Sequence, residues 1–280
     1  MFLHPAVFFI NYNFTMEMEH LKVKPIGHMK SGFLFKNGTP RQPTVAPSSK
    51  GEIKISKAVF TNPNHSLQGL DAYSHVWIIF HFHLNSNKGV KAKVKPPRLG
   101  VKTGVFSTRS PHRPNPVGLT LAKLESVDGD TLTVSGIDIV DGTPIVDIKP
   151  YIPAYDSLTE RNFTDTDDDG DDGKPVEKCA KIADWVSEKS TLKVVFTPRA
   201  FANVEASKLT SFGGVSGVQK IIGEILFEDP RSVYRRDECK DRLYYFKVKP
   251  VSVTVWFDES TTPATAEVLR VVFDDEVKSA

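Results

Sequence analysis

The distribution of hydrophobic and polar positions in the first half of the chain predicts short β-strands. Residues Val76–Phe82 form a continuous apolar and aromatic run that is too short for a helix and rich in β-forming side chains. Apolar and polar residues alternate over Thr120–Val127, and the turn Asp128–Asp130 leads directly into Thr131–Val134. This arrangement is typical of a β-hairpin.

A second pair of short apolar segments follows the first. Ile137–Val140 and Ile145–Ile148 flank the tight turn Asp141–Pro144, which predicts two more strands. Helical periodicity is nearly absent between Lys22 and Pro150. Short, closely spaced strands with glycine and proline between them favour a β-barrel or a β-sandwich over repeated β-α-β units.

The C-terminal third of the chain has a different pattern. Apolar residues recur at helical spacing over Val215–Glu228, and Asp229-Pro230 should end that helix. Other segments have the composition of strands: Leu192–Phe196, Leu243–Val248, Val251–Phe257 and Ala266–Val272. Together they predict a small α+β unit of about 80 residues appended to the β-rich part.

The net charge of +2 is distributed unevenly along the chain. Six aspartates lie within Asp165–Asp172, so the remaining residues carry about +8. A moderately basic body suits an anionic partner, although many metabolic enzymes share this balance. The acidic run does not fit an EF-hand, because its glycine comes late and Lys178 stands where the closing carboxylate should be. We therefore expect a solvated linker here.

Cysteine content and hydropathy indicate the cellular compartment of the protein. Cys179 and Cys239 are the only cysteines and have no metal-like spacing, so we expect a reducing compartment, the cytoplasm. The apolar segment Met1–Thr15 lacks the positive start and the cleavage site of a secretory signal. No window approaches the ~20 apolar residues that cross a bilayer, so no membrane partner is expected.

The most unusual stretch is Arg109–Leu119. Three prolines, Pro111, Pro114 and Pro116, exclude a helix or a central strand, so this segment is a rigid loop. The loop presents Arg109 and Arg113, whose guanidinium groups can pair with a carboxylate or a phosphate. From the residue types alone, a proline-stiffened surface loop with incidental charge is an equal alternative.

A second chemical segment, Gly136–Tyr151, combines several carboxylates with a lysine and a tyrosine around apolar strand residues. Carboxylates that converge on a pocket suit a cationic ligand or proton abstraction, although a turn aspartate is commonly structural. Two other motifs are weaker. The pair His81 and His83 lacks a third metal ligand at a recognisable spacing, and Gly213–Gly217 lacks the β-α-β frame of a nucleotide-binding loop.

Two runs, Gly104–Leu119 and Ile137–Tyr151, closely resemble the signature of the TsaA-like family. Further matches occur in the family's order along the chain: Pro25–Gly27, Gly38–Pro43, Gly69–Trp77, Pro96–Gly100 and Ile225–Arg235. The resemblance covers about Val23–Phe257, and motifs of this length in this order are very specific.

The resemblance implies a mainly β fold, a compact antiparallel TsaA-like β-barrel with a small C-terminal α+β domain. We therefore expect the barrel with the cofactor site at 21–158 and the remaining barrel strand with the C-terminal domain at 179–280. The unstructured extension (1–20) and the Asp165–Asp172 run of the acidic linker (159–178) depart from the family pattern. The resemblance leaves the cofactor site intact. It also implies S-adenosyl-L-methionine, held partly at a homodimer interface. The implied cofactor contacts are Pro40, Arg41, Gln42, His75, Val76, Arg109, Leu119, Asp141, Gly142, Thr143 and Pro144.

The family's activity implies methylation of N6 of threonylcarbamoyladenosine at position 37 in the anticodon loop of tRNA. Asp138 or Asp147 would accept the N6 proton, and Tyr151 would stack on the base. Arg109 would grip the methionine carboxylate of the cofactor or a substrate oxygen. No metal is expected. The expected phosphate contacts are Lys102, Arg113, Lys149, Arg235 and Arg236.

Two alternatives stay open at this point. One is an S-adenosylmethionine-binding RNA-binding or regulatory protein without turnover, and the other is a methyltransferase for a small molecule or a protein. The complete set of donor-site residues favours an enzyme. The C-terminal domain with its Asp229–Arg236 segment favours a macromolecular substrate.

Overall fold

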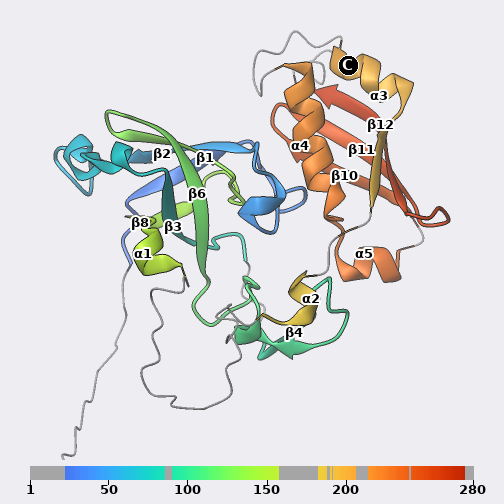
Figure 1. The fold of residues 1–280 in the computed structure, drawn as a ribbon, viewed down its shortest axis with the longest axis horizontal. Coiled ribbons are helices and arrows are strands. Elements are labelled where there is room, and N and C mark those ends of the chain that lie inside the picture. The colour runs from blue at the N-terminus through green and yellow to red at the C-terminus, as the bar shows by residue number, and fades with distance from the viewer. Residues whose placement is uncertain are drawn as a thin grey trace, which may run out of the picture.

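The computed structural model describes residues 23–85, 90–157, 182–187, 190, 192–205, 214–239 and 241–274. These residues form two units, a barrel and a separate sheet covered by helices (Figure 1). The expected extension (1–20), the acidic linker (159–178) and its Asp165–Asp172 run lie outside the described residues.

The first unit is a closed six-stranded barrel with strand order β1-β2-β7-β6-β3-β8, in which every pairing is antiparallel. The mainly β barrel expected from the sequence is therefore confirmed. Its strands are β1 (Gly27–Ser31), β2 (Lys50–Ile55), β3 (His75–His81), β6 (Val117–Asp128), β7 (Thr131–Ser135) and β8 (Pro144–Pro150).

Every second side chain of each barrel strand points inward and fills the barrel core. In β3, Val76, Ile78 and Phe80 point inward and are at most 3% exposed, because successive residues of a strand face opposite sides. Gly118 of β6 makes room for the largest of them, since a Cβ there would lie 2.3 Å from the Phe80 ring. A β-rich sequence thus becomes a packed barrel in which a glycine accommodates an aromatic ring.

The predicted hairpin over Thr120–Val134 is confirmed as β6 and β7, but the strand predicted at Ile137–Val140 is wrong. That segment is not part of a ladder, although Ile137 and Ile139 are buried. Its backbone is bound by hydroxyl groups: the Ser49 hydroxyl bonds both the amide and the carbonyl of Ile137, and the Ser31 hydroxyl donates to Ile139 O. Side-chain hydroxyls therefore take the place of a neighbouring strand.

The second unit is a four-stranded sheet of order β10-β11-β12-β9. Its strands are β9 (Lys193–Phe196), β10 (Leu243–Val248), β11 (Val251–Asp258) and β12 (Thr265–Phe273). The barrel strand expected within 179–280 is not there: β9 pairs in parallel with β12, and all six barrel strands precede Tyr151. The four strand predictions of this region are confirmed.

Helices α3 (Pro198–Glu205) and α4 (Val215–Phe227) pack against this sheet (Figure 1). Helix α4 buries five aliphatic side chains at the predicted spacing: Val218, Ile221, Ile222, Ile225 and Leu226. Full burial of each contributes about 1.5–3 kcal/mol, so this apolar stripe accounts for the docking of the helix.

Shorter elements connect the two units and complete the fold. They are η1 (Pro43–Val45), η2 (Pro63–Leu67), η3 (Leu70–Ala72), η4 (Val105–Ser107), β4 (Lys93–Val94), β5 (Thr103–Gly104), α1 (Pro153–Asp156), α2 (Asp184–Ser187) and α5 (Val233–Asp237). Within the described ranges, no helix combines the length and the apolarity that a membrane crossing requires.

Candidate active site

Three long loops leave the barrel at the same end. The register pairs Ser31 with Gly51 and Lys50 with Ser135, so β1 and β7 end beside the start of β2. Strand β3 runs in the same direction around the barrel and ends at His81, opposite Val117. The loops that start there are 32–49, 136–143 and 82–116. They contain most of the predicted cofactor residues, and Arg109 and the Asp141–Pro144 turn lie at this one end of the barrel.

Asp138 is the most perturbed carboxyl group at this end. Its Oδ1 accepts a hydrogen bond from the hydroxyl of Thr120, a β6 residue that is 1% exposed. Burial raises the pKa of Asp138 to about 6, while the Thr120 hydrogen bond and the positive charge of Arg109 act in the opposite direction. A carboxyl group with this pKa can take up or release a proton near neutral pH.

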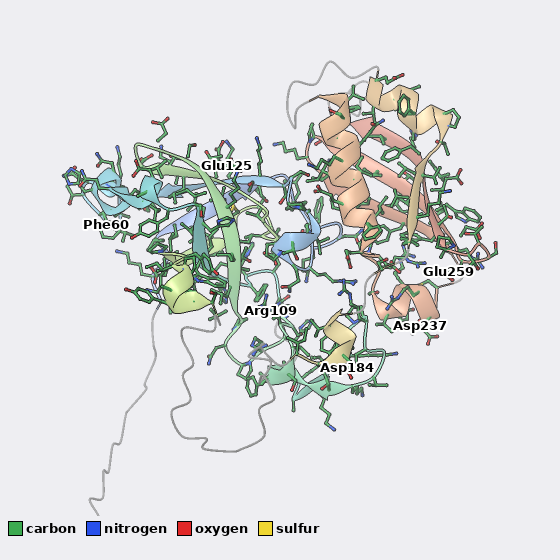
Figure 2. The ribbon with its side chains drawn as sticks, in the orientation of Figure 1. Phe60, Arg109, Glu125, Asp184, Asp237 and Glu259 are labelled. Carbon is green, nitrogen blue, oxygen red and sulfur yellow. The ribbon has the colours of Figure 1, made fainter. Side chains whose placement is uncertain are left out.

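Arg109 lies in the proline-rich loop (Figure 2), close enough to Asp138 for its positive charge to act on the carboxyl group. Its Nη1 donates to Gln42 Oε1 at 2.7 Å, which is the one hydrogen bond of its guanidinium within the described part of the chain. The other N–H groups of its exposed side chain can therefore bind an anionic group. Arg109 of loop 82–116 thus interacts with Gln42 of loop 32–49 by a hydrogen bond and with Asp138 of loop 136–143 by its charge.

The Asp141 carboxylate holds its own loop against β1. Asp141 Oδ1 accepts from the Ser31 amide at 2.8 Å, and the Asp141 amide donates to Phe33 O at 2.8 Å. Gly142 has a φ of +74°, a backbone conformation in which glycine is favoured, and its amide donates to Met29 O at 2.7 Å. The turn is therefore rigid, and Thr143 at its end is buried.

A second group of predicted residues lies on the outer face of β6, β3 and β8. Cross-strand pairing aligns Leu119 with Ile79 and Ile79 with Asp147 in one row, and Trp77 with Lys149 in the next. The Lys149 ammonium pairs with Asp147 Oδ2 at 2.9 Å. Tyr151 contacts Trp77 edge to face at 5.9 Å, and the Tyr151 amide donates to His75 O.

The barrel wall separates these two groups within one chain. Side chains of the outer face alternate with those of the core, and Val76 is completely buried between His75 and Trp77. The side chain of Val76 therefore contacts only the barrel core. His75, Leu119, Asp147, Lys149 and Tyr151 are not brought together with Arg109 and Asp138 in the single chain.

Arg41 is directed toward the second unit. Its guanidinium donates to three successive carbonyl oxygens, those of Asp229 at 3.2 Å, Pro230 at 3.0 Å and Arg231 at 2.6 Å. The neighbouring residue Pro40 is buried. Arg41 thus ties the loop that holds Gln42 to the segment that follows α4, rather than presenting its charge to the Arg109–Asp138 pair.

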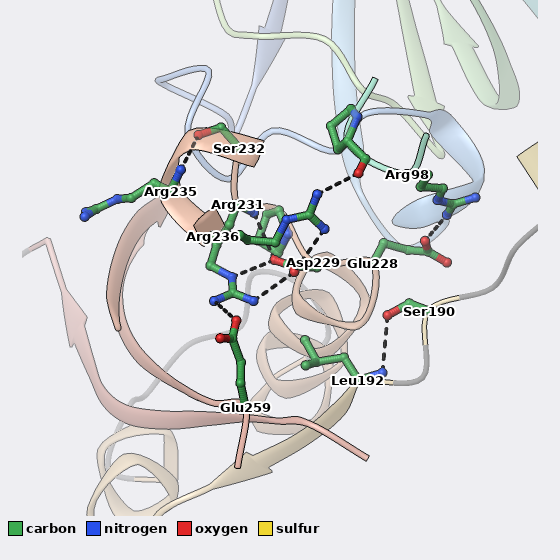
Figure 3. A network of polar contacts seen from close by, with 12 residues as sticks. Arg98, Ser190, Leu192, Glu228, Asp229, Arg231, Ser232, Arg235, Arg236 and Glu259 are labelled. Atoms are coloured by element: carbon green, nitrogen blue, oxygen red, sulfur yellow. Dashed lines mark hydrogen bonds and ion pairs between the residues drawn. The ribbon is translucent and has the colours of Figure 1, made fainter. Parts of the chain in front are cut away.

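The segment 229–231 is itself held by an ionic network around the buried Arg231 (Figure 3). Arg231, 7% exposed, donates from Nε to Asp229 Oδ1 at 2.9 Å and from Nη2 to Asp229 Oδ2 at 3.0 Å. Its Nη1 pairs with Glu259 at 2.9 Å, and its guanidinium lies 3.8 Å from the centre of the Phe257 ring. Asp229 has a φ of +44°, a strained conformation for a residue with a side chain.

The basic residues predicted to contact phosphates have different surroundings. Arg113 donates to Thr108 O at 2.7 Å and Val105 O at 3.2 Å, so it braces its own loop. Arg236 donates across the two units to Pro97 O at 2.6 Å, and within its own unit it pairs with Asp229 Oδ2 at 3.6 Å. Lys102, Lys149 and Arg235 keep more exposed side chains.

Sequence reasoning missed two residues that this geometry makes important. Thr120 is the hydrogen-bond partner of Asp138, and its polar side chain at an inward position of an otherwise apolar strand was the available signal. Ser31 holds both Asp141 and Ile139, and no local pattern distinguishes it. Among the described residues, no group of three or more histidine, cysteine or acidic side chains is arranged to hold a metal ion.

The fold and the site define a single-barrel protein with a charged cluster at one end of the barrel and a separate sheet domain. Residues 28–157 match the family described as "tRNA-methyltransferase O N-terminal domain". A "tRNA (adenine(37)-N6)-methyltransferase" from Rattus norvegicus is 33% identical and is aligned over 94% of this chain and 91% of its own length. The chain belongs to the tRNA-methyltransferase O family.

Bacterial relatives extend the similarity beyond the barrel. A "tRNA (adenine(37)-N6)-methyltransferase" from Escherichia coli is 35% identical over 81% of this chain and 89% of its own length. The crystal structure of TrmO from Pseudomonas aeruginosa matches with a TM-score of 0.62 and 27% identity, covering 91% of this chain and all of that chain. Coverage of this extent includes the second unit as well as the barrel.

Proposed function

We propose that this protein is an S-adenosyl-L-methionine-dependent methyltransferase that methylates N6 of adenosine 37 in tRNA, with the threonylcarbamoyl-modified base as its substrate. The observation that carries the proposal is the cluster of Gln42, Arg109 and the partly buried Asp138 at one end of a family-typical barrel. The names of the relatives support the reaction class and the substrate. A cytoplasmic location, where tRNA is modified, is part of the proposal.

The donor set at the barrel end fits the proposed cofactor. The methionine part of S-adenosyl-L-methionine carries a carboxylate, and the exposed Arg109 guanidinium retains N–H donors for such a group. The Asp141–Pro144 turn lies at the same end of the barrel, with the amides of Asp141, Gly142 and Thr143 bound to backbone carbonyls and Asp141 Oδ1 bound to the Ser31 amide, so it would contribute a fixed shape and its remaining oxygen atoms. Gln42, Arg109 and this turn would hold the cofactor, which supplies an electrophilic methyl group.

Asp138 is the residue to which we assign proton transfer. The N6 nitrogen must lose its proton when it becomes methylated, and a carboxylate with a pKa of about 6 is a competent acceptor at neutral pH. Thr120 orients the carboxylate and Arg109 favours its ionised form. Asp147 has the same chemical type but is paired with Lys149 on the outer face, so we assign it no proton transfer in the single chain.

Replacement of Arg109 by alanine should weaken binding of S-adenosyl-L-methionine by about 10- to 100-fold, the effect of losing charge-assisted hydrogen bonds. Arg109→Lys should restore part of the affinity, because it keeps the charge but loses the planar fork. Isothermal titration calorimetry of the purified protein measures this, with Arg199→Ala on α3 as the control for an exposed arginine. Equal affinities for both alanine variants would remove Arg109 from the cofactor site.

The proposed reaction is tested on tRNA directly. The purified chain is incubated with labelled S-adenosyl-L-methionine and tRNA that either carries or lacks the threonylcarbamoyl group, and the nucleosides are analysed by mass. We expect methylation at N6 of the modified base. If neither pool is methylated although the cofactor binds, the enzyme proposal fails and the non-catalytic RNA-binding alternative takes its place.

We also propose a homodimer that covers the outer face of β6, β3 and β8. This face exposes apolar side chains, with Val117 48% and Leu119 55% exposed, next to Trp77 and Ile79. Contiguous apolar side chains on the exposed face of a sheet favour association. In a symmetric pair, the residues on this face would approach those of a second copy.

Leu119→Glu should convert the proposed dimer into a monomer, because it buries a charge in the centre of the interface. Light scattering coupled to size-exclusion chromatography should give twice the chain mass for the natural protein and the single-chain mass for the variant. Phe60→Glu, which places a charge at an exposed apolar position in the loop between β2 and β3, is the control (Figure 2). A natural protein that runs as a monomer at high concentration contradicts the dimer.

A further inference from the structure

A basic cleft separates the barrel from the sheet domain at the end of the barrel that carries the candidate site. Its volume is about 610 Å³, and it is lined by loop 32–49, loop 82–116 and the segment that follows α4. We call it the junction cleft. Its lining includes Lys36, Lys95, His112, Tyr234 and Arg235, and no aspartate or glutamate of the described chain belongs to it.

We propose that the junction cleft binds the sugar–phosphate backbone of the RNA substrate, with Lys36, Lys95 and Arg235 as the phosphate contacts. The inference rests on the proposed function and specifies the surface through which that function is carried out. The lining is strongly cationic, and phosphate contacts by lysine and arginine dominate RNA affinity. A polyanion is therefore the occupant that this charge favours.

The three cations are available for a ligand. Lys95 pairs with Asp237 at 3.6 Å and Arg235 with Asp241 at 3.6 Å, and both acids are more than half exposed. Long, solvated ion pairs of this kind contribute little and exchange readily for a phosphate. Lys36 donates to Leu84 O at 3.1 Å, which leaves two of its three ammonium protons for another acceptor.

Arg41 and Arg236 also lie at this junction but have a different role. Their guanidinium groups are bound to backbone carbonyls of the facing unit, and Arg41 alone makes three such hydrogen bonds. Residues so engaged fix the walls of the cleft. We therefore assign phosphate binding to Lys36, Lys95 and Arg235, and we do not extend it to Arg236.

The cleft is connected to the candidate active site through two of its walls. Arg41 of the cleft precedes Gln42, which binds Arg109, and His112 of the cleft lies three residues after Arg109. Tyr234 is 68% exposed at the cleft and can stack on an unpaired base. A loop of RNA whose backbone lies in the cleft would thus have a neighbouring nucleotide beside Arg109 and Asp138.

The test compares two triple variants with equal loss of charge. The cleft variant carries Lys36→Gln, Lys95→Gln and Arg235→Gln. The control variant carries Lys24→Gln, Lys54→Gln and Lys57→Gln, three exposed lysines at the opposite end of the barrel. Affinity for unmodified bulk tRNA is measured by fluorescence anisotropy at several salt concentrations, and affinity for S-adenosyl-L-methionine is measured by calorimetry.

We expect the cleft variant to bind tRNA at least about tenfold more weakly than the control. The slope of its log association constant against log salt concentration should be shallower by roughly 0.7–0.9 for each lost phosphate contact. Its affinity for S-adenosyl-L-methionine should equal that of the natural protein, which also verifies that it folds. Equal tRNA affinity and salt dependence in both triple variants would overturn the cleft proposal.

Methylation assays distinguish a failure of the cleft proposal from a failure of the proposed enzymatic function. If the natural protein methylates tRNA and the cleft variant does so equally well at limiting tRNA, the proposed function stands and the cleft proposal is wrong. If the natural protein binds tRNA through the cleft but methylates no pool, the cleft proposal stands and the enzyme proposal is wrong.

Discussion

Replacement of Asp138 by asparagine is expected to lower the kcat of methyl transfer about 10²- to 10⁴-fold, the usual contribution of a positioned general base. Asparagine keeps the shape of the side chain and can still accept the Thr120 hydrogen bond, so the barrel end should stay folded. Single-turnover assays with saturating tRNA measure the chemical step. Asp147→Asn on the outer face is the matched control. It should lower kcat much less, because Asp147 lies apart from the Arg109–Asp138 site of its own chain.

The pH dependence of the reaction provides a second readout for Asp138. Its pKa is raised to about 6, so the base is protonated below that value. We expect kcat/KM of the natural protein to rise about tenfold per pH unit below this pKa and to level off above it. The residual activity of Asp138→Asn should lack this rise. An unchanged pH profile in the variant would assign the ionisation to another group.

The same substitution should stabilise the protein at neutral pH. An aspartate in the unfolded chain has a pKa of about 3.9, so between about pH 4 and 6 the folded state binds the proton more tightly than the unfolded state. The free energy of unfolding of the natural protein therefore falls as pH rises through this window. Asp138→Asn removes that loss, and its advantage should grow to on the order of 2 kcal/mol by pH 7. Urea denaturation at pH 4.5 and 7 measures the difference.

Replacement of Arg231 by leucine should lower the free energy of unfolding by about 3 kcal/mol, because it leaves the partly buried carboxylate of Asp229 with only the 3.6 Å ion pair to Arg236 and removes the partner of Glu259. The Asp229 carboxylate then loses its two guanidinium hydrogen bonds and keeps only the one from the backbone amide of residue 231, which weakens the support of a residue held at a φ of +44°. The carbonyl groups of 229–231 that receive Arg41 would no longer be fixed. Separation of the two units should therefore accompany the loss of stability.

Arg242→Leu is the control for Arg231→Leu. Arg242 lies just before β10 and pairs with Asp258 at 3.7 Å, but its side chain is 44% exposed, so its ion pair should contribute at most about 1 kcal/mol. Equilibrium denaturation of both variants compares a buried with an exposed arginine. Losses of equal size would show that the network of Asp229, Arg231 and Glu259 does not hold the junction.

The barrel end and the sheet domain are linked through Arg41. Asp138 and Arg109 belong to the barrel end, whereas Arg231 belongs to the sheet domain, and Arg41 links them through its bonds to 229–231. Because Gln42 follows Arg41 and binds Arg109, loss of the Arg231 network should also reduce cofactor affinity. This coupling would appear as a weaker binding of S-adenosyl-L-methionine by Arg231→Leu at temperatures where the protein is still folded.

Local patterns in the sequence predicted most of the regular structure. Periodicity of two identified β6 and β7, and helical spacing identified α4, because the buried face of each element has its own repeat. Strands β1 and β2 were not identified, although Lys50–Ile55 alternates exposed and buried residues. Strand β1 has no β-branched residue, and β2 has only Ile53 and Ile55 among glycine and charged residues, unlike the continuous apolar and aromatic run of β3.

The sequence by itself determined the chemical segments, since three prolines define a rigid loop around Arg109 wherever it lies. Only the tertiary structure decided which partners those segments meet. Barrel closure brings Thr120 to Asp138 and Gln42 to Arg109 over separations of 18 and 67 residues, and it places Asp147 and Tyr151 on the far side of the wall. Burial, which raises the pKa of Asp138, results from this packing because it depends on what surrounds the carboxylate in space.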